Sequence, residues 1–536
     1  MDNPTTSSEN PRKSDELDLE KEWDESPARN TSKSTSTICE PEMARTKAIK
    51  DEDAASSHQD LEGRPVMRTV TAQDWTGPDD PENPHNWSLG KRIYHTIPPG
   101  LFGFIVTFGS SVFTPANEEI ARHFHVSPTV ALLGVTLYVI GLGFGPMLSA
   151  PASETFGRLI VYRVSLPISL LFTLGAGFSK TFYSLMICRF FAGFAGSPVL
   201  AVGAGTNADL FPPKYRAIAT SSFLLAPFLG PSLGPFLGGW VAQYKDWRWT
   251  QWTSLFIGVA VYIISLPMKE TYKKTILQQR AKRFGIEPPH VPGPKSGWAT
   301  IKFLITVTLF RPAHMLIAEP IVGFLSLYNA FTFSILFAFF EAFPIVFGGI
   351  YGFSTSQVGL AFLAVGLGVA LGVVTAITID QVIYQKLHQQ ALAEGRTIVA
   401  PEHRLYAAMF GSIGIPIGLF IFAWTSRHSV HWIVPILASI PFAWGNISIF
   451  ISAALYLVDT YGPLNGASAI AANGLLRYGM SSVFPLFTVQ MYKKMHIDWA
   501  TTFLALMSML MLPIPWVLFK WGPKIRVKSH YDTIKA

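Results

Sequence analysis

The chain has 536 residues, of which 49% are hydrophobic and 14% are charged, and its mean hydropathy is +0.31. Because a typical soluble domain carries about 25% charged residues, this composition excludes an ordinary soluble enzyme or binding protein and predicts an integral membrane protein. The formal net charge of +7 comes mainly from polar joints between apolar runs and from the C-terminal end, so it indicates membrane topology and not nucleic-acid binding.

The cysteine and histidine content predicts neither a disulfide framework nor a metal site. Cys39 lies in a polar region and Cys188 lies inside an apolar run, so both are expected to be free thiols. We expect no metal ion and no cofactor. The first 92 residues contain no apolar core, so we expect no cleavable signal peptide.

Residues 1–92 are rich in Ser, Thr, Asp, Glu, Lys and Pro, which predicts a disordered cytoplasmic tail. The end of this tail, Trp75 to Lys91, differs in character. It contains Asp-Pro-Glu-Asn-Pro at Asp80–Pro84, followed by Trp87. We expect this segment either to lie at the membrane interface or to act as a stiff linker into the first span.

After the tail, apolar stretches alternate with short polar joints, and most stretches are long enough to cross a bilayer as a helix. The first half, residues 93–268, contains six: Ile93–Phe113, Thr129–Ser149, Val164–Phe178, Phe182–Asp209, Ala219–Val241 and Trp252–Met268. A basic central loop is predicted at 269–313. The second half, residues 314–519, contains six more: His314–Phe347, Gln357–Ile379, Leu405–Trp424, Trp432–Val458, Ser468–Met491 and Thr501–Phe519. Residues 520–536 form a predicted cytoplasmic tail.

This order predicts an all-α membrane protein with 12 transmembrane helices in two six-helix bundles and a substrate site near the midplane between them. The distribution of Lys and Arg predicts that both termini are cytoplasmic. The joints assigned to that side carry Arg158, Arg163, Lys214, Arg216, the central loop, Lys386, Arg396, Arg404, Lys520, Lys524, Arg526 and Lys528. The opposite joints carry fewer: Arg122, Lys180, Lys245, Arg248 and Arg427, although Lys493 and Lys494 break the pattern.

The joint between the second and third spans contains Glu154, Gly157 and Arg158 in a tight turn. Arg158 could pair with Glu154, with a neighbouring helix end or with Asp209, and so hold one conformation of the protein. The alternative is an ordinary solvated turn whose charge only sets topology. This joint is a candidate gate.

Two spans carry further features. Arg189 lies inside the fourth apolar stretch, where a guanidinium is costly unless it faces a polar cavity or a partner, or snorkels to the interface. The fifth stretch repeats glycine every four residues beside prolines, which predicts close helix packing and kinks. Its residues are Gly230, Gly234, Pro235, Gly238 and Gly239. A phosphate-binding loop is excluded because no Gly-Lys-Ser/Thr follows; generic helix packing remains the alternative.

Together these segments resemble the major facilitator superfamily, and within it the fungal drug:proton antiporters with 12 spans. Gly157 and Arg158 match the family's loop motif, in which Ala150 and Glu154 replace glycine and aspartate. Arg189 with Gly193 matches its span-four motif. The glycines and Pro235 of the fifth stretch match its antiporter motif. Further segments similar to fungal polyamine and azole exporters are Asp80–Pro84, Glu319-Pro320, Glu341–Pro344 and Pro401–Leu405.

The resemblance implies that Arg189 assists proton coupling, that Glu154 with Arg158 gates, and that the fifth stretch shapes the packing of an antiporter. It also shows departures. In the second half the counterpart of the loop motif is nearly lost, with Asp380 as its only obvious remnant. The first span contains no Asp or Glu, which excludes a proton-carrying acid there.

Few ionisable residues lie within or beside the spans. The acids Asp209, Glu319, Glu341, Asp380 and Asp459 are either proton-coupling groups or solvated helix ends, and Arg477 is placed centrally in the eleventh stretch. Expected substrate-contacting residues are Tyr328, Asn329, Trp444, Asn446 and Asn473; any of these could instead pack against lipid or other helices.

The sequence therefore predicts a proton-coupled exporter of drugs, toxins, secondary metabolites or polyamines, working as a monomer in the plasma membrane, with the vacuolar membrane as the other location. Its expected partners are a small-molecule substrate, protons and the lipid bilayer, but no nucleic acid. The alternative of the same fold is a facilitator or importer of a nutrient or organic acid. An intramembrane enzyme is not expected, because catalytic spacing of His, Asp or Ser is not found. A non-transporting receptor is the remaining class.

Overall fold

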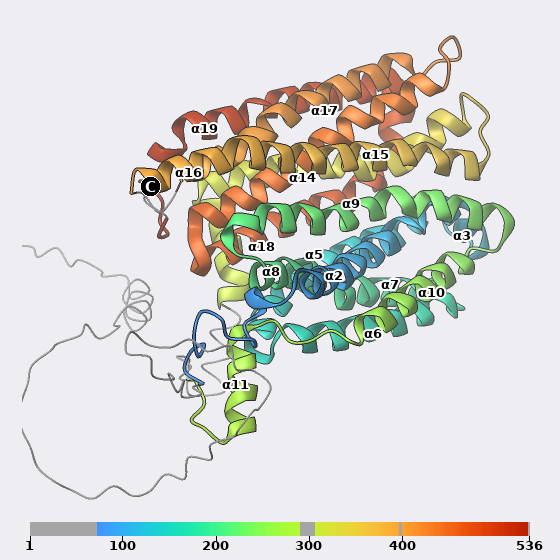
Figure 1. Cartoon of the computed structure of the whole chain (residues 1–536). Coiled ribbons are helices and arrows are strands. Elements are labelled where there is room, and N and C mark those ends of the chain that lie inside the picture. The colour runs from blue at the N-terminus through green and yellow to red at the C-terminus, as the bar shows by residue number, and fades with distance from the viewer. Residues whose placement is uncertain (1–71, 290–305, 396–398, 534–536) are drawn as a thin grey trace, which may run out of the picture.

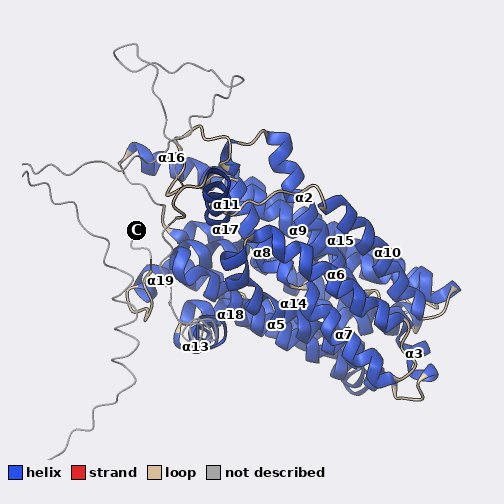
Figure 2. Ribbon diagram, turned by 90° about the horizontal axis from the view of Figure 1, so that it is seen from below, coloured by secondary structure: helices blue, strands red, loops and turns tan. Residues whose placement is uncertain are grey.

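The computed structural model describes residues 72–289, 306–395 and 399–533, and within these ranges every regular element is a helix (Figure 2). Most of the predicted N-terminal tail, part of the central loop and the last three residues lie outside the described residues. The helical fold follows from the apolar runs, because a chain in lipid must satisfy its backbone polar groups within each segment.

The first half of the chain forms the helices α2 to α11. They are α2 (Leu89–Ser111), α3 (Asn117–His123), α4 (Pro128–Ala131), α5 (Leu133–Phe156), α6 (Arg158–Gly177), α7 (Phe182–Gly196), α8 (Pro198–Leu210), α9 (Pro213–Tyr244), α10 (Arg248–Ser265) and α11 (Lys273–Phe284). The second half forms α13 (Arg311–Ala318), α14 (Pro320–Phe343), α15 (Thr355–Ile379), α16 (Gln385–Ala393), α17 (Tyr406–Thr425), α18 (Ile433–Met511) and α19 (Pro513–Arg526).

The helices of the two halves form two groups that lie against each other (Figure 1). The helices of the first half, blue to green, lie together, and those of the second half, yellow to red, lie above them in this view. α9 and α15 run side by side along the boundary between the groups. Their backbones approach closely there, since a Cβ added at Gly359 of α15 would lie 3.2 Å from the Cα of Phe236 of α9.

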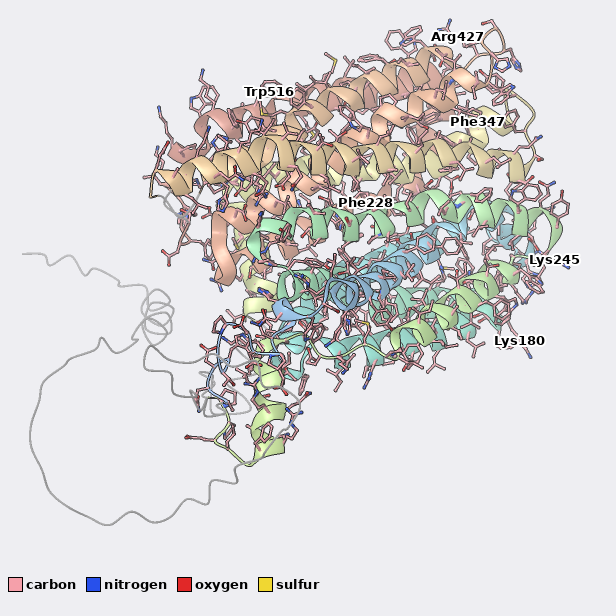
Figure 3. The ribbon with its side chains drawn as sticks, viewed as in Figure 1. Lys180, Phe228, Lys245, Phe347, Arg427 and Trp516 are labelled. Carbon is pink, nitrogen blue, oxygen red and sulfur yellow. The ribbon has the colours of Figure 1, made fainter. Side chains whose placement is uncertain are left out.

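Loops at the two ends of the bundle can be distinguished in the views. α11 and α16 project at one end, which we call the α11 end (Figure 1). Lys180, Lys245 and Arg427 lie at the opposite end, and Phe228 lies between the two groups of helices, well away from that end (Figure 3). The α11 end also joins the two halves, because Gln385 Nε2 donates to the carbonyl of Lys214 at 2.9 Å.

Within the described residues, ten helical stretches are long and apolar enough to cross a membrane. The predicted span Trp252–Met268 corresponds to α10, which is not among the ten; Arg248 and Gln251 near its start lower its mean hydropathy. The last of the ten, Asn465–Arg526, has 62 residues and contains both final predicted spans. It is not one straight helix, because His496 has φ 61° and ψ 164° inside α18. A second non-helical residue, Gly462, has φ 65° and separates residues 433–461 from the rest.

The structure corrects several predicted boundaries. The third predicted span corresponds to α6, which begins at Arg158 rather than Val164. It follows immediately after Gly157, whose φ of 98° ends α5. The predicted span Phe182–Asp209 is two helices, α7 and α8, which meet at Ser197 before Pro198. The long predicted span His314–Phe347 is divided at Glu319, where an extended residue precedes Pro320 and ends α13.

The predicted central loop and the end of the predicted tail contain ordered structure. α11 lies in the former loop, and the segment from Ala72 to Ser88 packs against it. Arg280 of α11 forms ion pairs with Asp80 and Glu82, and Lys273 pairs with Asp74. The acidic residues of the stretch Trp75 to Lys91 hold it on α11. Its place at the membrane interface or its role as a stiff linker stays a prediction.

Candidate transport site and charge networks

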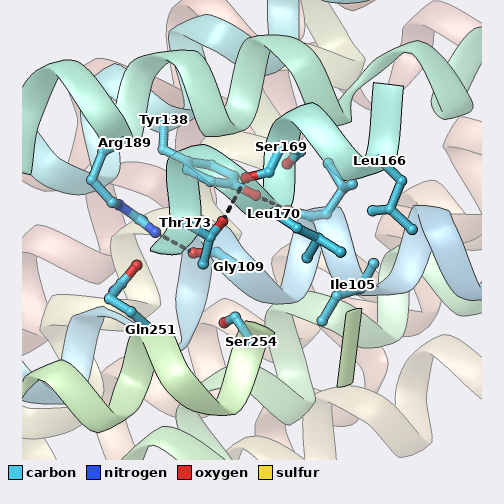
Figure 4. Close-up of a pocket in the computed structure, with 11 residues that line it drawn as sticks. Ile105, Gly109, Tyr138, Leu166, Ser169, Leu170, Thr173, Arg189, Gln251 and Ser254 are labelled. Atoms are coloured by element: carbon cyan, nitrogen blue, oxygen red, sulfur yellow. Dashed lines mark hydrogen bonds between the residues drawn. The ribbon is translucent and has the colours of Figure 1, made fainter. Parts of the chain in front are cut away.

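Arg189 of α7 lies in the interior of the first half and is 2% exposed (Figure 4). Its Nη1 donates to the carbonyl of Gly109 at 2.7 Å, and its Nε donates to the carbonyl of Gly134 at 3.0 Å. The guanidinium also lies over the rings of Phe113 and Tyr138, at 4.6 and 4.3 Å. Arg189 thus ties α7 to the carbonyls of α2 and α5 and does not snorkel to the interface.

Beside Arg189 lies a small cavity with a partly polar lining (Figure 4). The polar side chains around it are Tyr138, Ser169, Thr173, Gln251 and Ser254. The Nη2 atom of Arg189 is buried and has no hydrogen-bond partner. A buried cation beside polar groups, without a paired carboxylate among the described residues, responds strongly to any change of charge nearby.

At the α11 end, Arg158 begins α6 and pairs with Asp209 near the end of α8. The Arg158 Nε–Asp209 Oδ2 distance is 3.2 Å. Arg158 Nη1 also donates to Ser153 Oγ, and the guanidinium lies 4.8 Å from the ring centre of Tyr272. Glu154 is exposed and forms no ion pair with any residue that the structure describes. Of the partners considered from the sequence, the structure thus selects Asp209.

Glu270, which follows α10, completes this network. Its carboxylate accepts from the backbone N–H of Arg158 and of Leu159, both at 3.0 Å. These are free donors at the N-terminus of α6, where negative charge is favourable. A Cβ at Gly157 would collide with the Glu270 carboxylate, so this turn requires glycine for space as well as for its positive φ.

The second half contains a network of the same kind, although the sequence motif itself is nearly lost there, and its remnant Asp380 takes part in the network. Arg404 donates to Asp380 and to Asp459, each at 2.7 Å, and lies 3.5 Å from the ring centre of Tyr384. Arg158 with Asp209 and Arg404 with Asp459 occupy matching places. In each pair an arginine at or just before the start of one helix (α6, α17) meets an acid near the end of the following predicted span, which is α7 with α8 in the first half and residues 433–461 of α18 in the second. The residues that build the second network do not follow the spacing of the first motif.

The C-terminal segment is attached to this end by two buried acids. Arg526 Nε lies 2.9 Å from Glu402 Oε1. Glu319, which separates α13 from α14, accepts from Tyr461 Oη, Ser529 Oγ and the backbone N–H of His530, each at 2.8 Å. Glu319 is therefore tied into the C-terminal segment.

The glycines of α9 pack against both halves of the protein. A Cβ added at Gly230, Gly234 or Gly238 would collide with α2, at Thr107, Ser111 and Val112 respectively. A Cβ added at Gly239 would lie 2.7 Å from the carbonyl of Thr355 in α15. The stripe thus permits α9 to fit closely between α2 of the first half and α15 of the second.

Arg477 lies in α18, is 7% exposed, and is surrounded by rings. Its guanidinium is 4.6 Å from the centre of Phe333, 4.5 Å from Phe450 and 4.2 Å from Tyr478. Phe228 of α9 contacts Phe333 and Phe450, with ring centres 5.7 and 4.9 Å apart. These residues, which we call the Arg477 ring cluster, come from both halves of the chain.

The remaining predicted residues divide into two sets. Tyr328, Asn329, Asn446 and Asn473 are buried, and each has a side-chain atom without a hydrogen-bond partner. Trp444 instead donates to Thr375 Oγ1 of α15 at 2.9 Å and lies close to Gly414 of α17. Glu341 is half-buried near the end of α14 that lies opposite the α11 end.

Sequence reasoning missed Glu270, Arg404, Glu402 and the aromatic partners of Arg477. In the sequence, Glu402 is marked only by the similarity of its segment to fungal relatives, and Arg404 by that similarity and as one of the basic residues that set topology. The signal that could have identified them is that a charged residue at the edge of an apolar stretch needs an opposite charge on another helix. Sequence alone does not say which helix supplies it.

Residues 100–485 match the family profile of the Major Facilitator Superfamily. The chain is 41% identical over 526 residues to "Polyamine transporter 4" of Saccharomyces cerevisiae, covering 94% of this chain and 78% of that protein. It is 38% identical to "MFS-type efflux pump MFS2" of Trichophyton rubrum, covering 85% of this chain and 76% of the relative. The solved structure of the proton:xylose symporter XylE, from E. coli, has the same fold, with a TM-score of 0.60 at 16% identity over 81% of this chain and 96% of that one. The chain belongs to the major facilitator superfamily, a family of membrane transporters and not of enzymes.

Proposed function

We propose that this chain is a proton-coupled exporter of small organic molecules such as drugs, toxins, secondary metabolites or polyamines. The observation that carries the proposal is the position of α9. Its glycine stripe, which resembles the antiporter motif, packs on α2 with one set of residues and on α15 with Gly239. A helix held this closely by both halves is well placed to guide their relative motion. The similarity to a named efflux pump supports export.

We further propose twelve membrane crossings in two six-helix bundles. Ten helical stretches are long and apolar enough. α10 adds an eleventh, because its 18 residues run beside α6 and α2. The break at His496 divides Asn465–Arg526 into two, which gives twelve. A continuous helix of that length would measure about 93 Å, roughly three times the hydrocarbon core of a bilayer. The first bundle then ends with α10 and the second begins with α14.

The α11 end is proposed to face the cytoplasm, together with both termini. It carries Arg158, Arg404, Arg526 and the basic helix α11, whereas Lys180, Lys245 and Arg427 lie at the opposite end. Short loops rich in Lys and Arg stay on the cytoplasmic side. Lys493 and Lys494 oppose this majority. We place the protein in the plasma membrane.

In this orientation the networks of Arg158 and Arg404 hold helix ends together at the cytoplasmic side. Alternating access opens one side of the substrate path while the other stays closed. Each network lies within one half, Arg158 with Asp209 in the first and Arg404 with Asp380 and Asp459 in the second. Each therefore holds the helices of its own bundle together as a rigid group while the two halves move relative to each other. Arg189 is a buried cation whose Nη2 has no hydrogen-bond partner among the described residues. We propose that binding of a proton near Arg189 changes the position of this side chain and so the conformation of the first bundle. The likeness to a xylose symporter concerns the fold and does not favour import.

The test is efflux of a panel of labelled compounds, including an azole, from cells that express the wild-type chain, Arg189→Ala or Arg163→Ala, matched for surface expression. Arg163→Ala is the control, since it removes an exposed arginine from the same bundle. We expect wild-type and Arg163→Ala cells to export at least one compound until a protonophore is added, and Arg189→Ala cells to export none. Export that continues at the same rate with the protonophore would reject proton coupling. Net uptake of the compounds would reject export.

A further inference from the structure

The Arg477 ring cluster contains a positive charge whose balancing charge is not found among the described residues. Of the acids in and beside the spans, Asp209, Glu319, Asp380, Glu402 and Asp459 are engaged at the α11 end. Glu341 lies near the other end of α14. The guanidinium is held instead by the faces of Phe333, Phe450 and Tyr478. Cation–π contacts of this kind are favourable but do not supply the opposite charge that a guanidinium within a membrane needs.

Around this cation, hydrogen-bond donors are left without acceptors. The Nε of Arg477 is buried and has no hydrogen-bond acceptor among the residues that the structure describes. The Nδ2 atoms of Asn329, Asn446 and Asn473 are buried and unpartnered as well. A buried polar group without a partner is destabilising, so a ligand that supplies acceptors would satisfy these four donors, and the unpartnered Oδ1 of Asn329 would accept one hydrogen bond from it.

The three asparagines share faces with the ring cluster. Asn329 lies four residues before Phe333 in α14, Asn446 four residues before Phe450 in α18, and Asn473 four residues before Arg477. Residues four apart on a helix lie on the same face, one turn from each other. Arg477 contacts both Phe333 and Phe450, so each asparagine lies one turn from a member of the cluster. Phe228 brings α9 of the first half to the same place.

We propose that the Arg477 ring cluster and the asparagines Asn329, Asn446 and Asn473 form the substrate site, and that it prefers planar, conjugated organic anions. This inference rests on the proposed function, because it names the substrate class of an organic-molecule transporter. Arg477 Nε donates to a carboxylate or phenolate oxygen, the asparagines donate to further oxygens, and the rings stack on the planar part of the substrate. The residues come from both halves, as alternating access requires.

A polyamine fits this site poorly. Its ammonium groups carry only donors and positive charge, so they would be repelled by Arg477 and would leave the donors of the asparagines unpaired. A cationic substrate would have to displace Arg477 from the rings and occupy its place. The two possibilities predict opposite charge preferences.

Equilibrium binding to the purified full-length chain separates them, with three ligands that share one ring system: 2-naphthoate, neutral 2-naphthamide and 2-naphthylmethylammonium. Spermidine is added as a competitor. The variants are Arg477→Gln, which removes the charge, and Lys494→Gln, which removes an exposed charge from the same helix as a control. Should Arg477→Gln fail to fold, Asn473→Leu and Arg477→Lys supply the test.

We expect naphthoate to bind at least about tenfold more tightly than the ammonium compound, and spermidine not to compete. Arg477→Gln should weaken naphthoate binding about tenfold or more while naphthamide binding changes less, and Lys494→Gln should change neither. Asn473→Leu should weaken naphthoate binding, and Arg477→Lys should retain the preference for the anion. Preference for the ammonium compound, no binding of any of the three, or an unchanged ratio of naphthoate to naphthamide affinity in Arg477→Gln would overturn the inference. Proton-driven efflux is measured separately in cells. Export of cations alone would reject planar anions as the substrate class and leave the proposed exporter function intact. Binding of naphthoate without efflux would reject the exporter function and leave the anion site intact.

Discussion

Arg280 of α11 donates from Nη2 to both carboxylate oxygens of Asp80, at 2.9 and 2.8 Å. The two side chains are only 3% and 2% exposed, although they connect an N-terminal segment to a helix 200 residues later. Arg280 Nε also donates to Glu82 at 2.6 Å. An ion pair buried this well holds the segment in one position.

Replacing Arg280 with alanine should release the segment from Ala72 to Ser88, since it leaves Asp80 buried without its partner. Loss of one member of a buried pair costs about 3–5 kcal/mol. We would measure distances between spin labels at positions 79 and 279 in the full chain. The wild type should give one narrow distribution and Arg280→Ala a broad one. Arg283→Ala removes an exposed arginine whose one ion pair within the described residues is with Glu82, so its distribution should stay narrow. Equal broadening in both variants would contradict the prediction.

The same labels test the pH dependence of this contact. Burial alone would raise the pKa of Asp80, but hydrogen bonds from the backbone of Thr76 and Glu82 and from Arg280 outweigh it and hold the pKa below its ordinary 3.8. The docked segment therefore binds fewer protons than the free one. Its docking free energy is at its full value above pH 3.8 and declines as the pH falls below that value. The distribution should be constant from about pH 7 to 5; a change in that interval would assign the contact to another titrating group.

Glu270, and not Glu154, should be the acid on which the first network depends. Glu270→Ala removes the acceptor for two N–H groups at the start of α6, which should cost about 1–3 kcal/mol, lower the apparent Tm and slow transport. Glu154→Ala changes an exposed carboxylate in the preceding turn and should leave both quantities unchanged. Thermal unfolding in detergent and initial efflux rates give the comparison. A larger loss in Glu154→Ala would favour Glu154 as the partner of Arg158 in the candidate gate.

The close contact of α9 with α2 should be sensitive to a single methyl group. Gly234→Ala places a Cβ against Ser111 and 2.9 Å from the backbone nitrogen of Val112, so the helices must separate, at a cost of about 1–3 kcal/mol. Efflux should fall by more than the amount of folded protein at the cell surface. Gly474→Ala is the matched control, because nothing lies within 4 Å of its added Cβ. If the two variants transport equally well, the stripe has no role in guiding the halves.

Much of the fold could be predicted because the signal is local. A helix that crosses lipid needs about 20 apolar residues, and this requirement is met within each stretch without regard to the others. The observed helix ends differ from the predicted ones where one residue interrupts the helix inside an apolar stretch, as at Gly157, Pro198 and Glu319. The ordered position of residues 72–88 could not be predicted, because their composition is that of a disordered tail. The position depends on Arg280, which lies far away in the sequence.

For the candidate site, residue type showed at which positions a charge is buried at a cost in free energy. It did not show which groups offset that cost. A guanidinium in an apolar stretch marked Arg189 and Arg477 as unusual. Their surroundings differ, with carbonyls of α2 and α5 around one and three rings around the other. These partners come from other helices, so no spacing within one stretch encodes them.

By itself the sequence determined that this protein lies in a membrane as a series of helices and that it resembles the major facilitator superfamily. Hydropathy, glycine spacing and isolated charges are properties of single helices, so they can be recognised in the sequence of each helix alone. Only the tertiary structure decided that Arg158 pairs with Asp209, that Arg404 builds a second network, and that Arg477 meets rings from both halves. The energies of burying a charge depend on which groups other helices bring within a few ångströms, and that arrangement exists only once the helices are packed.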